Sequence, residues 1–252
     1  MSHAELSSRR EAHVLHLQLN RPDKGNALST LLVQALTETL EAATRDPELR
    51  LLVLSGAGRH FCTGFDLSDL DHETDDSLLA RFTRVELMLQ AVHGAPFATL
   101  ALAHGRTLGA GADLFAACSE RWIVGDASFA FPGAGFGLVL GTSRLASLVG
   151  ATQTAQWIEG AAPIDAAQAC ASGLATRQIA ADALEGELDR LSARVGRLDP
   201  LTQRGVHAAI ATERRPRGAA GDAEDLARLV HSAARPGLRH RIAAYRASQR
   251  KS

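Results

Sequence analysis

The sequence has little cysteine, little net charge and no long apolar run. Its three cysteines, Cys62, Cys118 and Cys170, are odd in number and form no CxxC pair, so neither a disulfide framework nor a zinc knuckle is indicated. The formal net charge of −1 gives no reason to expect nucleic acid or an anionic membrane as a partner. No N-terminal apolar segment is present, and no run approaches the ~20 residues of a membrane span. We therefore expect a soluble, cytoplasmic protein.

The apolar content of 46% in 252 residues is enough for an α/β domain with an appendage. Residues Val14–Leu19 alternate between apolar and polar and predict a half-buried strand. A helix is expected to begin after Ser29, a plausible N-cap, and to stop at Asp46-Pro47. Leu51–Leu54 is the next apolar strand. The order strand, helix, strand implies a right-handed crossover and a parallel sheet.

A glycine-rich junction at His104–Leu114 follows the buried strand expected at residues 97–103. Its glycines allow the backbone to approach a ligand, and a helix is expected over Ala110–Cys118. The first amides of a helix have no intrahelical partner and suit a negatively charged oxygen. Asp113 lies in the first turn of that helix. From these residues alone, a ligand-binding loop and a tight packing corner are both compatible with the pattern.

Three segments together resemble the crotonase, or enoyl-CoA hydratase/isomerase, superfamily in their order and spacing. They are LNRPDKGNAL (19–28), GAGRHFCTGFDL (56–67) and HGRTLGAGADL (104–114), and the likeness runs from about residue 12 to about residue 180. The resemblance implies an α/β, crotonase-like spiral of ββα units with two roughly perpendicular sheets. It implies a core with the acyl-CoA site at residues 1–195 and a C-terminal helical oligomerisation region at residues 196–252. A homotrimer or a dimer of trimers is the implied assembly.

The same resemblance implies how an acyl-CoA thioester binds. The backbone N–H groups of Phe65 and Ala110 match the two donors that hold the thioester oxygen as an enolate forms. No separate cofactor is implied, because coenzyme A arrives as part of the substrate. We assign no metal-binding site to the sequence. Further substrate-binding positions carried over from the family motifs are Lys24, Gly25, Ala27, Gly64, Asp66, Leu67 and Gly109.

The carboxylates depart from the hydratase pattern. Hydratases of this family hold a water between two glutamates, one acting as base and the other as acid. Here the first position is Asp113 and the second is Gly133, which has no side chain. The acid found nearby in some dienoyl-CoA isomerases and dehalogenases falls near Gly141. Two-carboxylate hydration therefore lacks half of its groups, and Asp113 is the best remaining candidate for proton transfer.

Three alternatives remain open from the sequence. Asp113 acts alone, as in a single-carboxylate isomerase; or it pairs with a histidine, as in the superfamily's β-diketone C–C hydrolases; or the chain binds acyl-CoA with little or no catalysis. The candidate histidines are His60, His93 and His104. A helix expected at Leu78–Val92 would cover the acyl pocket. No motif encodes the identity of the acyl chain.

Overall fold

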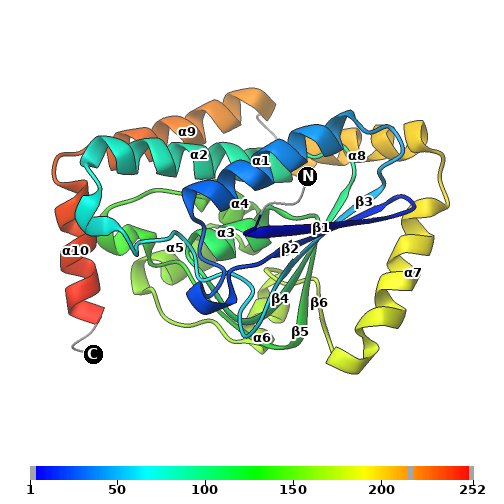
Figure 1. Ribbon diagram of the computed structural model, residues 1–252, viewed down its shortest axis with the longest axis horizontal. Coiled ribbons are helices and arrows are strands. Elements are labelled where there is room, and N and C mark those ends of the chain that lie inside the picture. The colour runs from blue at the N-terminus through cyan, green and yellow to red at the C-terminus, as the bar shows by residue number, and fades with distance from the viewer. Residues whose placement is uncertain (1–3, 215–217, 250–252) are drawn as a thin grey trace.

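The computed structural model describes residues 4–214 and 218–249, and its strands form one twisted sheet. The strand order follows the sequence. The first two strands are antiparallel, whereas every later neighbour pair is parallel (Figure 1). This is the parallel sheet that the strand–helix–strand order predicts. The strands are β1 (Leu6–Glu11), β2 (Val14–Leu19), β3 (Leu51–Gly56), β4 (Ala98–Leu108), β5 (Glu120–Ala130) and β6 (Arg177–Ile179).

Helices cover both faces of this sheet. In β3, Leu52 and Leu54 belong to the core cluster beneath the first helices, whereas Leu51 and Val53 belong to a second cluster that includes Leu191 of α7. Alternate residues of a strand point to opposite faces, so a strand buried on both sides reads as a continuous apolar run. The helices are α1 (Thr30–Arg45), α2 (Asp75–His93), α3 (Ala110–Ala117), α4 (Thr142–Val149), α5 (Ala151–Gly160), α6 (Ala166–Ser172), α7 (Leu184–Gly196), α8 (Pro200–Arg214), α9 (Gly218–Ala233) and α10 (Leu238–Gln249).

The expected early elements are confirmed. The strand at Val14–Leu19 has the predicted bounds. The side chain of Ser29 caps α1 by accepting a hydrogen bond from Leu32 N at 3.0 Å. The helix ends at Arg45, one residue before Asp46, as the following proline requires.

Strand β4 is longer than the sequence pattern predicts. We expected it to end at residue 103, but it continues to Leu108 after a register shift against β5 between Ala103 and Gly105. Gly105 adopts a φ of +57°, and a Cβ there would lie 2.8 Å from His60 Nδ1. The glycine therefore lets the β3–α2 connection pass close to β4. Because β4 extends to Leu108 and α3 begins at Ala110, only Gly109 lies between the strand and the helix.

Two features differ from the sequence expectations. The polar, charged segment at residues 6–11 forms an edge strand, β1, which only its pairing with β2 reveals. The two perpendicular sheets implied by the resemblance are also not distinguished, because all the named strands belong to one sheet. Beyond the register shift, isolated bridges join segments outside these strands: Leu28 with Phe65, Cys62 with Thr107, and Phe129 with Ile164. The first two bridges tie the glycine-rich loops together.

The last two described helices pack against α2 rather than against the sheet (Figure 1). They form a third apolar cluster in which Phe82 of α2 meets Leu229 of α9 and Ile242 of α10. Residues 215–217 lie outside the described residues, and α9 begins at Gly218. The C-terminal region is helical as expected, but its role in oligomerisation stays a prediction.

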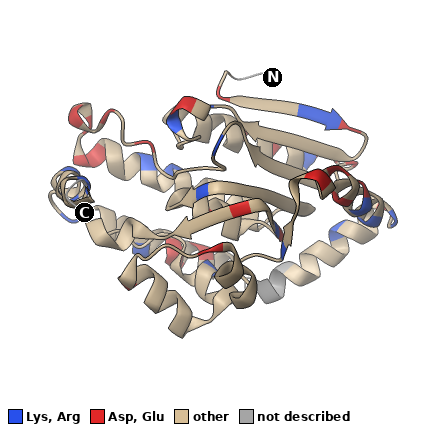
Figure 2. Cartoon of the chain, turned by 90° about the horizontal axis from the view of Figure 1, so that it is seen from below, with Lys and Arg blue, Asp and Glu red and all other residues tan. Residues whose placement is uncertain are grey.

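Charge is spread over the fold without a dominant sign. Figure 2 shows Lys and Arg interspersed with Asp and Glu around the periphery, which agrees with a net charge near zero. Across residues 4–214 and 218–249, no helix is both long and apolar enough to cross a membrane.

Candidate active site

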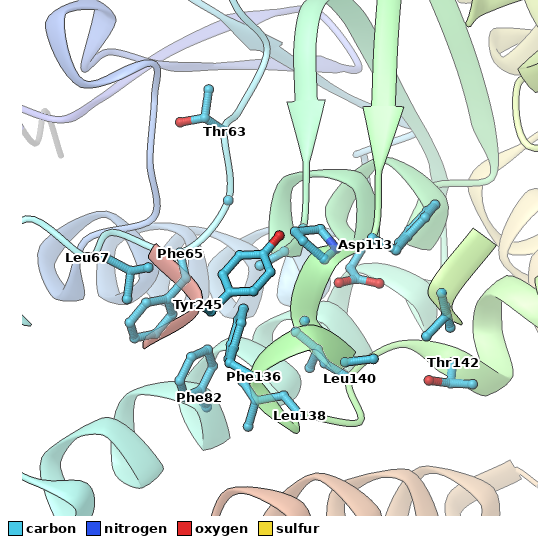
Figure 3. A pocket seen from close by; sticks show the side chains of 18 of the residues that line it. Thr63, Phe65, Leu67, Phe82, Asp113, Phe136, Leu138, Leu140, Thr142 and Tyr245 are labelled. Carbon is cyan, nitrogen blue, oxygen red and sulfur yellow. The ribbon is translucent and has the colours of Figure 1, made fainter. Parts of the chain in front are cut away.

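A cavity of about 150 Å³ lies where several parts of the chain meet. They include the loop after β3, the β4–α3 junction, the 3-10 segment Pro132–Phe136 (η3) and the helix α10. Apolar side chains make up most of the wall, including Phe65, Phe82 and Leu138 (Figure 3). A concave, largely apolar site with few polar groups is typical of a small-molecule site.

The two glycine-rich loops converge at this cavity. A Cβ on Gly64 would lie 2.7 Å from Leu108 O and 3.5 Å from Ala110 N, so the two backbones touch and only glycine fits between them. Gly64 has a φ of +96°, which L side chains rarely adopt. The residue at 65 therefore lies next to the first amide of α3.

The amides of Phe65 and Ala110 both lack an acceptor within the described residues. The neighbours of Phe65 are paired, since Gly64 O accepts from Leu28 N at 2.7 Å and Asp66 N donates to Leu28 O at 3.2 Å. That parallel bridge leaves the Phe65 N–H unpaired. Ala110 is the first residue of α3, where no intrahelical acceptor exists. Two unpaired N–H donors thus lie on one cavity wall, an arrangement suited to a developing oxyanion.

Asp113 lines the same cavity from the first turn of α3. It is only 5% exposed, and its carboxyl group makes no hydrogen bond to any described residue. Burial raises the pKa of Asp113 to about 8; the charge of Arg144 opposes this rise and that of Glu86 adds to it. A carboxyl that titrates near neutral pH is suited to take and return a proton.

Behind Asp113 lies a buried ion pair. Arg144 Nη1 donates to Glu86 Oε1 at 2.7 Å, and Arg144 Nη2 donates to Glu86 Oε2 at 2.6 Å. Both side chains are buried, at 6% and 1% exposure. This pair joins α4 to α2 and places a guanidinium near Asp113. The guanidinium is engaged by Glu86 in a bidentate arrangement, so it influences Asp113 only through space.

Gly141 makes room for the Asp113 carboxyl. It has a φ of +65°, and a Cβ there would overlap Asp113 Oδ1 and lie 2.8 Å from Asp113 Cγ. Gly141 is also the N-cap of α4. The isomerase-type acid that the resemblance sets near this position is therefore incompatible with the present position of Asp113.

Gly133, by contrast, leaves open space. It lines the cavity, and a Cβ there would meet only Leu138 Cβ, at 3.9 Å. At the position where the second carboxylate is missing, the cavity wall is thus open, and no other side chain blocks it.

The predicted substrate-binding positions fall into two groups. Gly64, Leu67 and Gly109 line the cavity together with the candidate catalytic positions. The other four do not line it. Lys24 is exposed on a 3-10 turn, and the buried Ala27 follows that turn. Gly25 O accepts a hydrogen bond from Thr63 N at 3.0 Å, and Asp66 pairs with Arg21 at 2.8 Å. Of this second group, only Gly25 is hydrogen-bonded to a residue of the cavity wall.

The structure does not support a His/Asp pair. His104 Nε2 bonds to Gly58 O at 2.9 Å, and His60 Nδ1 accepts from Arg106 N at 3.1 Å. His93 is buried, with Nδ1 3.3 Å from Ala117 O. No histidine is among the described residues that line the cavity. The three rings are held by backbone contacts elsewhere, so the structure does not favour the alternative in which a histidine pairs with Asp113.

Sequence reasoning missed the contribution of α10 to the cavity wall. Tyr245 and Arg246 both line it. Arg246 Nη1 donates to Leu67 O at 3.0 Å and so ties α10 to the loop after β3. No motif in the sequence signals this placement, which depends on the packing of α10 against η3.

Residues 9–245 match a family model described as enoyl-CoA hydratase/isomerase. Among curated relatives, a mitochondrial Delta(3,5)-Delta(2,4)-dienoyl-CoA isomerase of Mus musculus is 33% identical over 154 residues, which are 56% of this chain and 47% of the relative. An enoyl-CoA hydratase named echA6, from Mycobacterium tuberculosis, is 34% identical over 168 residues, covering 65% of this chain and 66% of the relative.

A solved structure extends this likeness to the whole fold. A protein of Bordetella parapertussis, described as an enoyl-CoA hydratase/isomerase, is 41% identical with a TM-score of 0.90, and the match covers 97% of this chain and 99% of the other. In contrast, the chain spans about half the length of the mammalian dienoyl-CoA isomerases that it matches.

Proposed function

The chain belongs to the enoyl-CoA hydratase/isomerase family, and we propose that it is an acyl-CoA thioester enzyme that shifts a carbon–carbon double bond. One observation carries the proposal: the unpaired amides of Phe65 and Ala110 share a small cavity with the unbonded carboxyl of Asp113. This set contains an oxyanion site and a single proton carrier, which are the minimum that enolate chemistry requires.

The proposed reaction begins with the thioester oxygen between the amides of Phe65 and Ala110. The Asp113 carboxylate removes a proton from the α-carbon of a 3-enoyl-CoA, and the electron pair of the C–H bond moves into the thioester to form a dienolate. The two N–H groups stabilise the oxygen as it gains charge, and one such donor contributes about 3–4 kcal/mol to lowering a barrier. A proton delivered to the γ-carbon restores the thioester carbonyl and leaves the double bond between the α- and β-carbons.

The charge state of Asp113 sets the expected pH dependence. Since burial raises its pKa to about 8, much of the free protein carries a protonated Asp113 at neutral pH. The base is the carboxylate, so kcat/KM for isomerisation should rise with pH and level off above about pH 8.

Isomerisation is preferred to hydration because of Gly133. Hydration adds a proton and a hydroxide from one water, which the family's two glutamates divide between them. The open wall at Gly133 offers no side chain for the second half of that task. An isomerase, in contrast, only moves a proton along the chain.

The cavity volume favours a short acyl segment. A cavity of about 150 Å³ holds a ligand of roughly six carbons, judged from an engineered apolar cavity that takes up benzene. Coenzyme A then lies outside the cavity, as part of the thioester substrate, and the proposal includes no further cofactor.

The test is steady-state isomerisation of a short 3-enoyl-CoA by the wild type and Asp113→Asn, with binding of butyryl-CoA measured by calorimetry. Asp113→Asn keeps the shape of the side chain but removes the base, so kcat should fall by at least about 10²-fold with the affinity for butyryl-CoA retained. Equal turnover by both proteins would refute the role of Asp113. Binding without turnover by the wild type would identify an acyl-CoA-binding homologue instead.

Gly133→Glu distinguishes isomerisation from hydration. If the second carboxylate is all that hydration lacks, this change should raise the rate of crotonyl-CoA hydration above that of the wild type. A wild type that already hydrates crotonyl-CoA faster than it isomerises a 3-enoyl-CoA would overturn the preference for isomerisation.

A further inference from the structure

The cavity has few polar side chains besides Asp113. Among the described residues that line it, Thr63, Thr142, Tyr245 and Arg246 carry polar groups. Thr63 Oγ1 lies 3.5 Å from Lys24 O, and Arg246 donates to the backbone of the loop after β3. The hydroxyl groups of Thr142 and Tyr245 make no hydrogen bond to any described residue. These two hydroxyls are therefore unpaired and available to a ligand.

The ring of Tyr245 is held in place from the η3 side. A Cβ on Gly135 would lie 2.7 Å from Tyr245 Cε2, so the ring packs directly on the glycine backbone. The Phe136 ring packs against it, with 5.4 Å between the ring centroids. Figure 3 shows the Tyr245 ring between Phe65 and Asp113, with its hydroxyl on the side toward Asp113. Backbone and ring contacts thus aim one hydroxyl into the cavity.

Thr142 is placed differently. It is the first residue of α4, and Figure 3 shows it on the far side of Asp113 from Tyr245. Thr142 therefore lies at the start of α4, next to Gly141, the residue that makes room for the Asp113 carboxyl. Tyr245 and Asp113, in contrast, line the cavity from separate elements, α10 and α3.

We propose that the Tyr245 hydroxyl is the second proton-carrying group of the site and delivers the proton that the γ-carbon receives. This inference rests on the proposed function, since it divides between two residues the proton transfer that Asp113 begins. In this proposal the Tyr245 hydroxyl of α10 takes the role of the proton donor that is missing at Gly133.

The atoms and electrons balance in three steps. Asp113 takes the α-proton, and the electron pair of that C–H bond passes into the dienolate held by the two amides. Tyr245 then gives its O–H proton to the γ-carbon, where the dienolate supplies the electron pair of the new C–H bond. The resulting tyrosinate finally takes the proton from the Asp113 carboxyl, which restores both groups without any further reactant.

The protonation state of Tyr245 agrees with a donor role. Burial raises the pKa of Tyr245 above its ordinary value, so the hydroxyl keeps its proton at neutral pH. The charged groups that share the cavity wall with it are Asp113 and Arg246. Because the pKa of Asp113 is raised, its proton affinity is closer to that of a phenol than the proton affinity of an ordinary carboxyl is. This smaller difference eases the final proton transfer.

Two assays separate the roles of the two residues. Exchange of the α-protons of butyryl-CoA with deuterium oxide needs only Asp113 and the amides, because butyryl-CoA has no double bond to move. Isomerisation of a 3-enoyl-CoA needs the γ-proton as well. Tyr245→Phe, which removes one oxygen, should lower isomerisation by about 10²-fold or more and leave α-proton exchange close to that of the wild type.

The other outcomes are equally informative. Isomerisation unchanged in Tyr245→Phe would overturn the proposal, as would equal loss of exchange and isomerisation with butyryl-CoA binding retained. If Thr142→Val, rather than Tyr245→Phe, separates the two assays, the second group is Thr142 and the proposal is wrong. Exchange that survives in Asp113→Asn would instead refute the proposed function itself.

A spectroscopic control follows from the composition. Because Tyr245 is the only tyrosine, protein made with isotope-labelled tyrosine gives a single tyrosine NMR signal. That signal should shift when butyryl-CoA binds. A signal that does not move on saturation would place the ring outside the substrate's reach and overturn the proposal.

Discussion

Two buried carboxyl groups near one arginine, Glu86 and Asp113, differ in how they are paired. Glu86 of α2 accepts two hydrogen bonds from Arg144 and a third from Gln90 Nε2 at 2.8 Å. Asp113 of α3 is nearly as buried, yet it accepts no hydrogen bond from any described residue. The Glu86 carboxyl is fully engaged by Arg144 and Gln90, whereas the Asp113 carboxyl faces an apolar cavity.

The difference shows how stability and reactivity are separated within one small volume. A buried charge is costly unless it is paired and hydrogen-bonded, so the Glu86–Arg144 pair suits a structural role. Asp113 avoids that cost by holding its proton, as its raised pKa indicates. A group that exchanges its proton near neutral pH is of little use to stability but well suited to catalysis. Three changes test this comparison.

The largest effect is expected from breaking the ion pair. Arg144→Met leaves the Glu86 carboxyl buried without its partner, which costs about 3–5 kcal/mol in the free energy of unfolding. It also removes the positive charge that holds down the pKa of Asp113. Urea unfolding at neutral pH measures the first effect. The second should appear as a shift of the isomerisation profile to higher pH.

The matched control removes both members of the pair. In Glu86→Leu combined with Arg144→Met, no buried charge is left unpaired, so the double variant should be more stable than Arg144→Met alone. A double variant that is less stable than the single one would show that the cost comes from lost packing and not from an orphaned carboxylate.

Much of the framework around this comparison could be predicted from the sequence. The bounds of β2 and α1 follow from local periodicity and capping, and the glycine-rich segments locate both loops of the cavity wall. The positions of Phe65, Ala110 and Asp113 on one cavity follow the motif order. Local patterns suffice there because each element's own residues determine its bounds.

The rest depends on contacts between distant segments. Arg144 and Glu86 are 58 residues apart, and neither belongs to a motif that names its partner. Tyr245 reaches the cavity only because α10 packs back against η3. The edge strand β1 is polar on all but one residue, so its pairing with β2 and not its composition makes it a strand. Such contacts are set by tertiary packing, which a single sequence does not display.

A smaller effect is expected at the glycine that accommodates Asp113. Gly141→Ala introduces a left-handed alanine, which costs about 1–2 kcal/mol, and its Cβ must displace the Asp113 carboxyl. Gly173→Ala is a suitable control, since Gly173 is also left-handed, with a φ of +85°, but its nearest neighbour would be Leu148 O at 3.4 Å. Both variants should lose stability by thermal unfolding, Gly141→Ala the more because its Cβ also displaces the Asp113 carboxyl, and only Gly141→Ala should lose isomerase activity. Equal loss of activity would sink the positioning role of Gly141.

The smallest effect, measured over one pH unit, concerns the proton on Asp113 itself. In the unfolded chain this carboxyl ionises near its ordinary pKa of 3.8, whereas the folded protein keeps the proton up to about pH 8. Between those values the folded state binds more protons than the unfolded state, so its stability falls as the pH rises, by about 1.4 kcal/mol per unit.

Asp113→Asn has no proton to lose at this position. The difference in unfolding free energy between Asp113→Asn and the wild type should therefore grow by about 1.4 kcal/mol from pH 6 to pH 7, in urea titrations of both proteins, and stop growing above about pH 8. A difference that stays constant over that range would mean that Asp113 is ionised in the folded protein. It would then resemble Glu86, and the contrast between the paired and the reactive carboxyl would disappear.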